Sequence, residues 1–436
     1  MGTPIAFVIH PELRHAQSSR PAKLMLDEAC LLANGIGLGV VHSEIIALTK
    51  LRARSYFGTG VTERLGNLVE DFTLEIDTPL VIINTSLSPV QQRNLETQIK
   101  AKVIDRTQLI LEIFGARAQT HAGRLQVELA ALSFQRSRLV RSWTHLERQR
   151  GGSGFLGGPG ERQIELDRRM LMDRVTRIKA ELKEVTRTRT LQRRNRLRSE
   201  TPTVALIGYT NAGKSTLFNR LTGADVLSKD MLFATLDPTI RELDFVSGRK
   251  VVLADTVGFI SQLPTELVEA FKSTLEEVVH ADVLLHVHDA SSPLVTEEAA
   301  DVNKVLGDLG MDAETQAARI LHVFNKADLL TAGDVQFTSL QNRFLGDVFV
   351  SAKTGDGVDD LLANLDHHLG KTAVLARIKI TPTDGAARAW LHQNAMVKSS
   401  HFDDQGHEQI LVSIDPADYA RLCSRWPALC VFRAEA

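Results

Sequence analysis

The sequence contains little cysteine, with three residues in 436, and no long uninterrupted apolar runs. Cys30, Cys423 and Cys430 form no C-x-x-C pair, so a disulfide framework or a zinc site is not expected, and a reducing compartment fits best. No stretch approaches the roughly 18 consecutive apolar residues that a membrane span needs. The N-terminus lacks the basic and apolar regions of a secretion signal, and Ala6 stands where a myristoylation signal requires Ser or Thr. We expect a cytoplasmic protein without a membrane span, with peripheral membrane association left open.

The net charge of −2 also excludes a uniformly basic or acidic protein, but it conceals a local asymmetry. Residues 136–200 hold 18 Lys and Arg against 8 Asp and Glu, and most of these bases are arginine. A solvated helix face and a nucleic-acid surface both fit such a run. Arginine favours the second interpretation, because its guanidinium matches phosphate and stacks on bases.

Length and periodicity predict a multidomain α/β protein, at about 150 residues per domain. Short apolar runs alternate with amphipathic stretches over residues 1–118, which predicts an N-terminal α/β domain. Residues 119–199 read as helical, and residues 201–370 have the βα rhythm of a mainly parallel sheet. Residues 375–436 predict a small C-terminal α+β domain.

Heptad spacing predicts that the helical region is a long antiparallel hairpin. Apolar side chains recur every seven residues from Leu125 to Leu146, and again from Ile164 to Val185. Two such helices of about 28 residues would each reach roughly 40 Å. The break between them, residues 151–160, is the glycine-rich run GGSGFLGGPG, which would form the tip. It contains a G-x-G-x-x-G pattern, but a basic helix and not a strand precedes it, so we reject a dinucleotide site. Two interpretations of this run remain possible. It is either a flexible hinge or a finger whose small residues allow close approach to a crowded backbone.

A buried strand at residues 204–207 leads into G-x-x-x-x-G-K-S and then a helix, which identifies a P-loop. In such a loop, backbone N–H groups turn toward phosphates at a helix N-terminus. Lys214 would reach the β- and γ-phosphates, and the Ser215 hydroxyl would ligate magnesium. A second apolar strand, residues 251–254, is followed by Asp255-Thr256-Val257-Gly258. Asp255 would hold the magnesium ion through a water molecule, and the Gly258 N–H would meet the γ-phosphate. Thr235 is our candidate for a switch ligand to magnesium, with Thr239 as the alternative.

The strand at residues 321–324 ends in an N-K-x-D motif, Asn325-Lys326-Ala327-Asp328. A carboxylate there can accept two hydrogen bonds from the N1–H and N2–H₂ of guanine, donors that adenine lacks. Lys326 would cover the ring face. The next strand ends in Ser351-Ala352-Lys353, placed to offer a backbone N–H to the guanine O6. Four motifs in this order predict a P-loop GTPase domain.

Three further residue choices bear on chemistry. His286 and His288 alternate on one strand face but have no Cys or carboxylate at ligand spacing, so we interpret them as structural. Phe259 follows Gly258, where many GTPases have a glutamine that orients water, so intrinsic hydrolysis should be slow. Asn211 stands where some GTPases hold a potassium ion, which is a hypothesis for this chain.

The glycine-rich run, its flanking residues 143–149 and 167–169, and the segment 233–239 resemble the HflX GTPases. Phe259 agrees with the glutamine that this family lacks. The likeness covers residues 1 to about 370, although Val61 stands after Gly58-Thr59-Gly60 where the family often has lysine. It implies a GTPase of the TRAFAC class that binds the large ribosomal subunit and its RNA. It also implies that the tip reaches toward the peptidyl-transferase region and that the GTP form splits stalled ribosomes under stress.

By resemblance, magnesium lies on Ser215 and Thr235, and we expect a monomer. The resemblance implies that the nucleotide is held by Gly208, Tyr209, Thr210, Asn211, Ala212, Gly213, Lys214, Ser215, Phe233, Ala234, Thr235, Leu236, Asp237, Asp255, Thr256, Val257, Gly258, Asn325, Lys326, Ala327, Asp328, Ser351, Ala352 and Lys353.

Two other functions fit the same motifs. One is an RNA-associated GTPase acting in ribosome assembly or tRNA modification; the latter would need a cysteine or cofactor-binding domain. The other is a protein that holds GTP without hydrolysing it.

Overall fold

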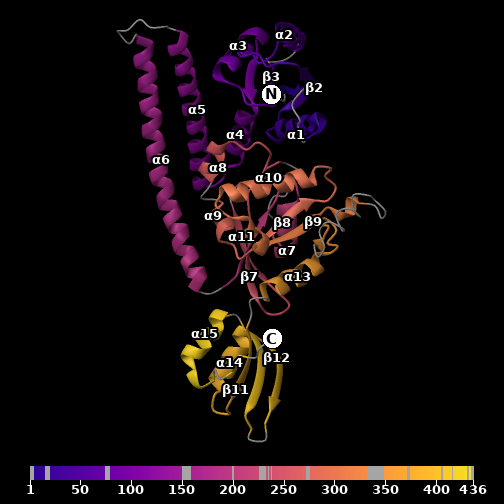
Figure 1. Ribbon diagram of the computed structural model, residues 1–436, viewed down its shortest axis with the longest axis vertical. Coiled ribbons are helices and arrows are strands. Elements are labelled where there is room, and N and C mark those ends of the chain that lie inside the picture. Colours follow the sequence, from indigo (N-terminus) through magenta and orange to yellow (C-terminus); the bar gives the residue numbers. More distant parts are fainter. Residues whose placement is uncertain are drawn as a thin grey trace.

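A computed structural model of the chain describes residues 4–14, 20–73, 79–149, 159–198, 201–224, 232–233, 235–236, 238–271, 275–330, 348–370, 374–403, 406–414, 416–429 and 432–433. These residues form a mixed α/β protein with three sheets and a long helical hairpin (Figure 1). The first sheet lies at one end of the molecule, the third at the other, and the hairpin runs beside the first two. The predicted fold class is confirmed.

The first sheet is parallel, with strand order β2-β1-β3-β4. Its strands follow the predicted apolar runs, and the side chains of residues 5–9 in β1 are buried. The elements are β1 (Ile5–Leu13), α1 (Ala22–Gly35), β2 (Gly39–Leu48), α2 (Thr59–Thr73), β3 (Leu80–Ile83), α3 (Pro89–Ile99), β4 (Lys102–Asp105) and α4 (Arg106–Arg117).

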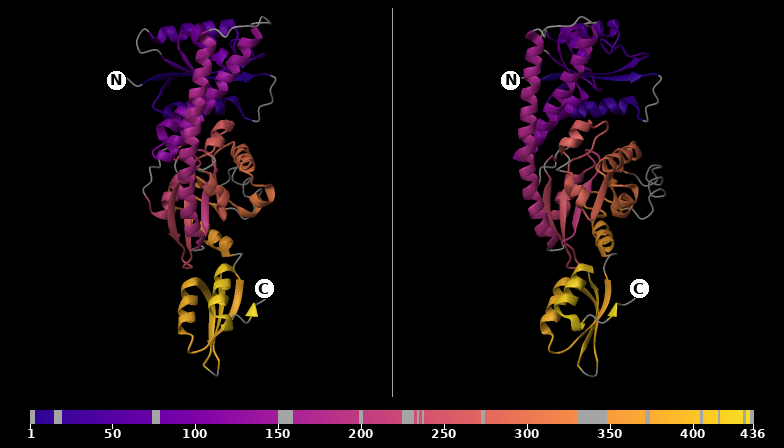
Figure 2. Two further views of the ribbon diagram at one scale, coloured as in Figure 1. Left: turned by 90° about the vertical axis from the view of Figure 1, so that its left-hand side faces the viewer. Right: turned by 60° about the vertical axis from the view of Figure 1, so that its left-hand side comes forward.

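The hairpin consists of α5 (His121–Gln149) and α6 (Pro159–Arg198), which pack antiparallel (Figure 2). Helix α5 has 29 residues, close to the expected length, whereas α6 has 40 and reaches roughly 60 Å. The expected length was too short because neither glycine nor proline interrupts residues 161–201. The glycine-rich residues 151–158 lie outside the described residues.

Heptad side chains hold the two helices together near the second sheet. Leu125, Leu129, Val175 and Ile178 are all buried there in one hydrophobic core. Across the seam, Arg174 Nε lies 2.7 Å from a carboxylate oxygen of Glu128. Because both groups are largely exposed, this ion pair fixes alignment more than it adds stability.

The second sheet has strand order β10-β9-β8-β5-β7-β6, parallel except for β6 at one edge. Alternate residues of its strands face two separate cores, one on each side of the sheet. The elements are β5 (Thr203–Ile207), α7 (Lys214–Thr222), β6 (Thr239–Asp244), β7 (Lys250–Asp255), α8 (Thr265–Phe271), α9 (Glu276–His280), β8 (Val283–Asp289), α10 (Val295–Asp308), α11 (Ala313–Arg319), β9 (Ile320–Asn325), β10 (Val348–Phe349) and α13 (Val358–Gly370).

The third sheet has order β12-β13-β11-β14, with antiparallel neighbours. Cys423, in this region, is disulfide-bonded, so the expectation of no disulfide is wrong there. No described helix is both long and apolar enough to cross a bilayer. The elements are β11 (Val374–Ile380), α14 (Gly385–Asn394), β12 (Ala395–Phe402), β13 (Glu408–Ile414), α15 (Pro416–Arg425) and β14 (Phe432–Arg433).

Candidate nucleotide-binding site

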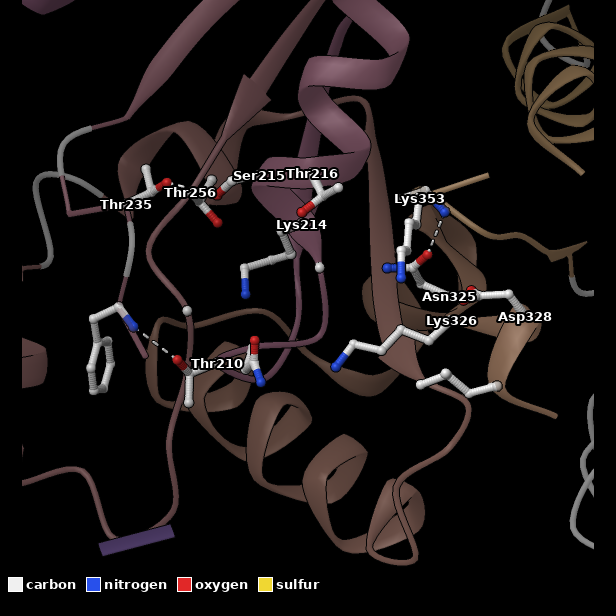
Figure 3. Close-up of a pocket in the computed structure, with 16 residues that line it drawn as sticks. Thr210, Lys214, Ser215, Thr216, Thr235, Thr256, Asn325, Lys326, Asp328 and Lys353 are labelled. Carbon is white, nitrogen blue, oxygen red and sulfur yellow. Dashed lines mark hydrogen bonds between the residues drawn. The ribbon is translucent and has the colours of Figure 1, made fainter. Parts of the chain in front are cut away.

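A cavity of about 550 Å³ lies at the carboxyl ends of the parallel strands of the second sheet (Figure 3). All four predicted motifs reach it, because strand ends in a parallel sheet meet at one edge. Its lining consists of Thr210, Asn211, Gly213, Lys214, Ser215, Thr216, Phe233, Thr235, Thr256, Gly258, Asn325, Lys326, Asp328, Leu329, Ala352 and Lys353.

Two glycines give the P-loop its shape. Gly208 and Gly213 have φ angles of 146° and 88°, which L side chains rarely adopt. A Cβ on Gly213 would lie 2.1 Å from the side-chain nitrogen of Asn325, and one on Gly208 would lie 2.2 Å from the Val287 carbonyl. Only glycine allows the loop to approach β8 and β9 this closely. The loop then delivers Lys214 to the first position of α7.

Lys214 is a buried cation that backbone carbonyls surround. Its Nζ donates hydrogen bonds to the oxygens of Gly208 at 3.0 Å and Tyr209 at 2.8 Å. Burial lowers the pKa of Lys214 to about 8, and the carboxylate of Asp255 opposes this shift. An anionic group in the cavity would favour the charged form of the amine in the same way.

Three oxygens converge beside the P-loop. Ser215 Oγ lies 2.7 Å from Thr235 Oγ1, and each hydroxyl lies 2.8 Å from Asp255 Oδ2. The other carboxylate oxygen of Asp255 is buried with no hydrogen-bond partner among the described residues, and burial raises the pKa of this group. Hydroxyl and carboxylate oxygens are the ligands that Mg²⁺ prefers. Thr239, the alternative, opens β6, pairs with Asp255 across the strands and does not line the cavity.

At the other end of the cavity, Asn325 connects two loops. Its side-chain nitrogen donates to the Ala212 carbonyl at 2.8 Å, and its side-chain oxygen accepts from the Ala352 N–H at 2.9 Å. The Ala352 N–H is therefore directed at Asn325, which the sequence did not anticipate. Asp328 accepts a hydrogen bond from Ser351 Oγ at 2.7 Å, and Lys326 Nζ lies 2.6 Å from Asp289.

Not every predicted residue lines this cavity. Asp255 and Ser351 are not among the lining residues, but they form hydrogen bonds with Ser215 and Asp328, which are. Ala234 and Asp237 lie outside the described residues. The remaining residues form the backbone of the loops or face a core, and they are Gly208, Tyr209, Ala212, Leu236, Val257 and Ala327.

Phe259 is buried away from the cavity, with 3% of its surface exposed. Its backbone bridges the P-loop: its N–H donates to the Gly208 carbonyl, and its carbonyl accepts from the Thr210 N–H. Its ring packs in the core with Ile207 and Leu284. This side chain therefore cannot contact a water molecule at a phosphate, in agreement with the sequence interpretation.

The sequence did not predict that the first domain contacts the P-loop and the segment after Gly258. Tyr209 Oη accepts hydrogen bonds from the Ser261 N–H at 2.8 Å and from Arg20 at 3.1 Å, and it donates to Glu28. Arg106, in α4, bonds both Glu28 at 2.7 Å and the Ser261 carbonyl at 3.2 Å. Charged and hydroxyl groups thus link the domains beside the cavity.

An aromatic cluster extends this link. The ring of Phe114, at the end of α4, meets the ring of Phe233 edge-on, with centroids 4.7 Å apart. It meets Phe271 of α8 at 4.9 Å. Phe233 also donates its backbone N–H to Thr210 Oγ1 at 3.0 Å. The segment that carries Thr235 therefore shares a core with the first domain.

Comparison with known proteins agrees with this geometry. Three family models match, described as GTP-binding GTPase N-terminal over residues 23–115, GTP-binding GTPase Middle Region over 117–196 and 50S ribosome-binding GTPase over 203–326. A curated relative named GTPase HflX from Magnetococcus marinus is 48% identical over 399 residues, which is 91% of this chain and 90% of the relative. GTPase HflX from Escherichia coli is 44% identical over 350 residues, covering 80% and 81%.

A solved structure is also similar, that of a GTP-binding protein from the archaeon Sulfolobus solfataricus in complex with GDP. It is 21% identical, with a TM-score of 0.43, and the match covers 84% of this chain and 98% of that one. Because this TM-score is low, the family of this chain is established by its sequence relatives.

Proposed function

Since this chain belongs to the HflX family of GTPases and hydrolyses GTP, we propose that its GTP form binds the large ribosomal subunit and dissociates stalled ribosomes under stress. The ribosome would in turn stimulate hydrolysis. We further propose that the protein acts as a monomer in the cytoplasm. The observation that carries the proposal is the core shared by the nucleotide-sensing segments and the base of the hairpin.

GTP would occupy the 550 Å³ cavity with its phosphates at the N-terminus of α7. Lys214 would bind the β- and γ-phosphates, and the Gly258 N–H would meet the γ-phosphate. A Cβ at position 258 would lie 3.0 Å from the Thr210 backbone and 3.1 Å from Lys214 Nζ, so a larger residue would be crowded there. Asp328 would accept the guanine hydrogen bonds while Ser351 holds its carboxylate.

A magnesium ion suits the hydroxyl oxygens of Ser215 and Thr235, which lie 2.7 Å apart and both contact Asp255 Oδ2. The other carboxylate oxygen of Asp255 is buried with no hydrogen-bond partner among the described residues, so it is available to a water ligand of the ion. Ser215 and Thr235 would ligate the ion, with Asp255 acting through water. When bound, the ion would neutralise charge on the phosphate oxygens. Thr235 then reports on the γ-phosphate because its position depends on this ligand set.

Thr235 follows Phe233 in the chain by two residues, and Phe233 packs on Phe114. Buried side chains of α5 and α6, such as Leu129 and Ile178, belong to the same core. Packed cores switch between discrete arrangements and do not deform continuously. A change at the γ-phosphate would thus move the base of a hairpin that is roughly 60 Å long. The arginine-rich charge of residues 136–200 suits that hairpin to ribosomal RNA.

The proposal predicts tighter ribosome binding in the GTP state. Protein loaded with a non-hydrolysable GTP analogue should bind large subunits about 5–150-fold more tightly than GDP-loaded protein, the usual range of allosteric coupling. Phe114→Leu keeps an apolar side chain but loses the edge-on contact, so it should shrink this ratio without changing nucleotide affinity. Co-sedimentation at fixed salt measures the ratio.

Phe57→Leu is the matched control, because Phe57 is equally buried but belongs to a separate core of the first domain. It should leave the GTP-to-GDP ratio unchanged. Equal binding of the two nucleotide forms by the unmodified protein would contradict the proposal.

We also propose that potassium takes part in hydrolysis at Asn211, which lines the cavity in a left-handed conformation with φ of 62°. A monovalent cation beside the phosphates would supply the positive charge that other GTPases obtain from arginine. Asn211→Ala should therefore remove any difference in turnover between potassium and sodium buffers. A variant that keeps its potassium dependence would exclude this role for Asn211.

A further inference from the structure

Three histidines meet on one face of the second sheet, outside the nucleotide cavity. Parallel pairing of β8 and β9 places His286 directly opposite His322, and His288 follows two residues later on the same face. One ring nitrogen from each lies within 4.8 Å of the other two. The sequence interpretation of His286 and His288 as structural rested on the absence of a further ligand, and β9 supplies that ligand.

Part of this cluster has unsatisfied hydrogen-bonding capacity. His286 is 1% exposed, and its Nδ1 is buried with no hydrogen-bond partner in the part of the chain that the structure describes. A buried polar atom without a partner is costly and calls for an explanation such as an ion. His288 Nε2 and His322 Nδ1 lie 2.9 Å apart. This contact holds the two rings side by side.

The ligand type and the exposure of the cluster also suit a metal. A neutral imidazole nitrogen is a common metal ligand, and three of them converge here. Whereas His286 and His288 are buried, His322 is only partly buried, so solvent reaches the cluster from its side.

We propose that His286, His288 and His322 bind one Zn²⁺ ion, with solvent as the fourth ligand. Tetrahedral zinc has Zn–N distances of about 2.0–2.1 Å, which sets ligand nitrogens about 3.3 Å apart. The present separations, 2.9 Å for one pair and at most 4.8 Å for the others, lie on either side of that value, so binding the ion would require the rings to turn. Imidazole ligands without carboxylates select borderline ions of the zinc type over Mg²⁺ or Ca²⁺.

The ion would join the two strands that carry the guanine end of the cavity. Strand β8 ends at Asp289, and Lys326, just after β9, forms an ion pair with it at 2.6 Å. Zinc on His286, His288 and His322 would hold these strands in register behind that pair. The ion would therefore support the guanine end of the cavity from behind, and it lies apart from the proposed magnesium ligands.

The test uses the tag-free full-length protein, stripped with a chelator and titrated with Zn²⁺ against a chromophoric competitor. One site per chain is expected. His322→Gln, chosen because position 322 is partly exposed and glutamine can still hydrogen-bond His288, should weaken zinc binding at least about 100-fold, comparable to losing a supporting ligand contact. His392→Gln, at an exposed position on α14, is the matched control and should bind zinc as the unmodified protein does.

Zinc should also raise the melting temperature of the unmodified protein and of His392→Gln, but not that of His322→Gln. X-ray absorption spectroscopy at the zinc edge of the unmodified protein should show three imidazole ligands. This measurement tests the proposal even if the variant does not fold. The absence of a stoichiometric site, unchanged affinity in His322→Gln, or an absorption spectrum with sulfur ligands would each overturn the proposal.

Discussion

Purified large ribosomal subunits should accelerate GTP hydrolysis by this protein by about 10³–10⁵-fold, the gain that activators supply to other GTPases. The expectation follows from the position after Gly258. Phe259 is buried beneath the P-loop and is not part of the cavity wall, so it cannot orient the attacking water. Some other group must do so, and the proposed ribosome-bound state provides it.

The measurement is phosphate release at saturating GTP, with and without large subunits. Small subunits at the same concentration are the control for added RNA, and they should leave the rate unchanged. Equal rates with and without large subunits would rule out the ribosome as the activator.

Deleting residues 152–158, which connect α5 and α6 in the sequence, should separate ribosome binding from nucleotide binding in the same assay. The variant should keep its affinity for GTP, because none of the described residues that line the cavity comes from the hairpin. It should lose most of the stimulation by large subunits. Weaker GTP binding would instead mean that the tip belongs to the nucleotide site.

Asp328→Asn should exchange guanine for xanthine specificity, with a loss of GTP affinity of about 10–150-fold. The Asp328 carboxylate lies at the cavity wall, where Ser351 Oγ orients one of its oxygens at 2.7 Å. Hydrogen bonds to charged groups each contribute about 1.5–3 kcal/mol, and the amide can replace at most one of two acceptors. The same amide can donate to the extra oxygen of xanthine, so XTP binding should improve.

Equilibrium titration with fluorescent GTP and XTP analogues measures both constants. Asp308→Asn is the matched control, since Asp308 is exposed at the end of α10 and outside the cavity. Unchanged preference for GTP in Asp328→Asn would refute the assignment of base recognition.

Local sequence patterns were sufficient to predict the parts of the site in which nucleotide binding requires one particular backbone conformation. Gly208 and Gly213 could be predicted because their φ angles and close contacts exclude other residues, and each motif ends a strand that its apolar run identifies. The heptads likewise predicted an antiparallel pair of helices. The length of α6 was underestimated because the prediction ended with the apolar seam, whereas the arginine-rich segment continues the helix without a breaker.

Contacts between distant segments could not be predicted in this way. Nothing near Tyr209 in the sequence indicates that its hydroxyl meets Glu28 and Ser261. The pairing of His322 with His286 depends on the register of two parallel strands that a helical crossover separates. The Cys423 disulfide was also missed, because spacing alone does not determine which cysteines meet.

By itself, the sequence determined that this chain has a P-loop, guanine specificity and a cationic hairpin, since those features depend on residues adjacent in the chain or at helical spacing. Only the tertiary structure decided that Phe114 packs on Phe233, so that the nucleotide-sensing segment shares a core with the base of the hairpin. The reason is physical: apolar burial is non-directional, and which surfaces meet depends on the shape of the whole chain.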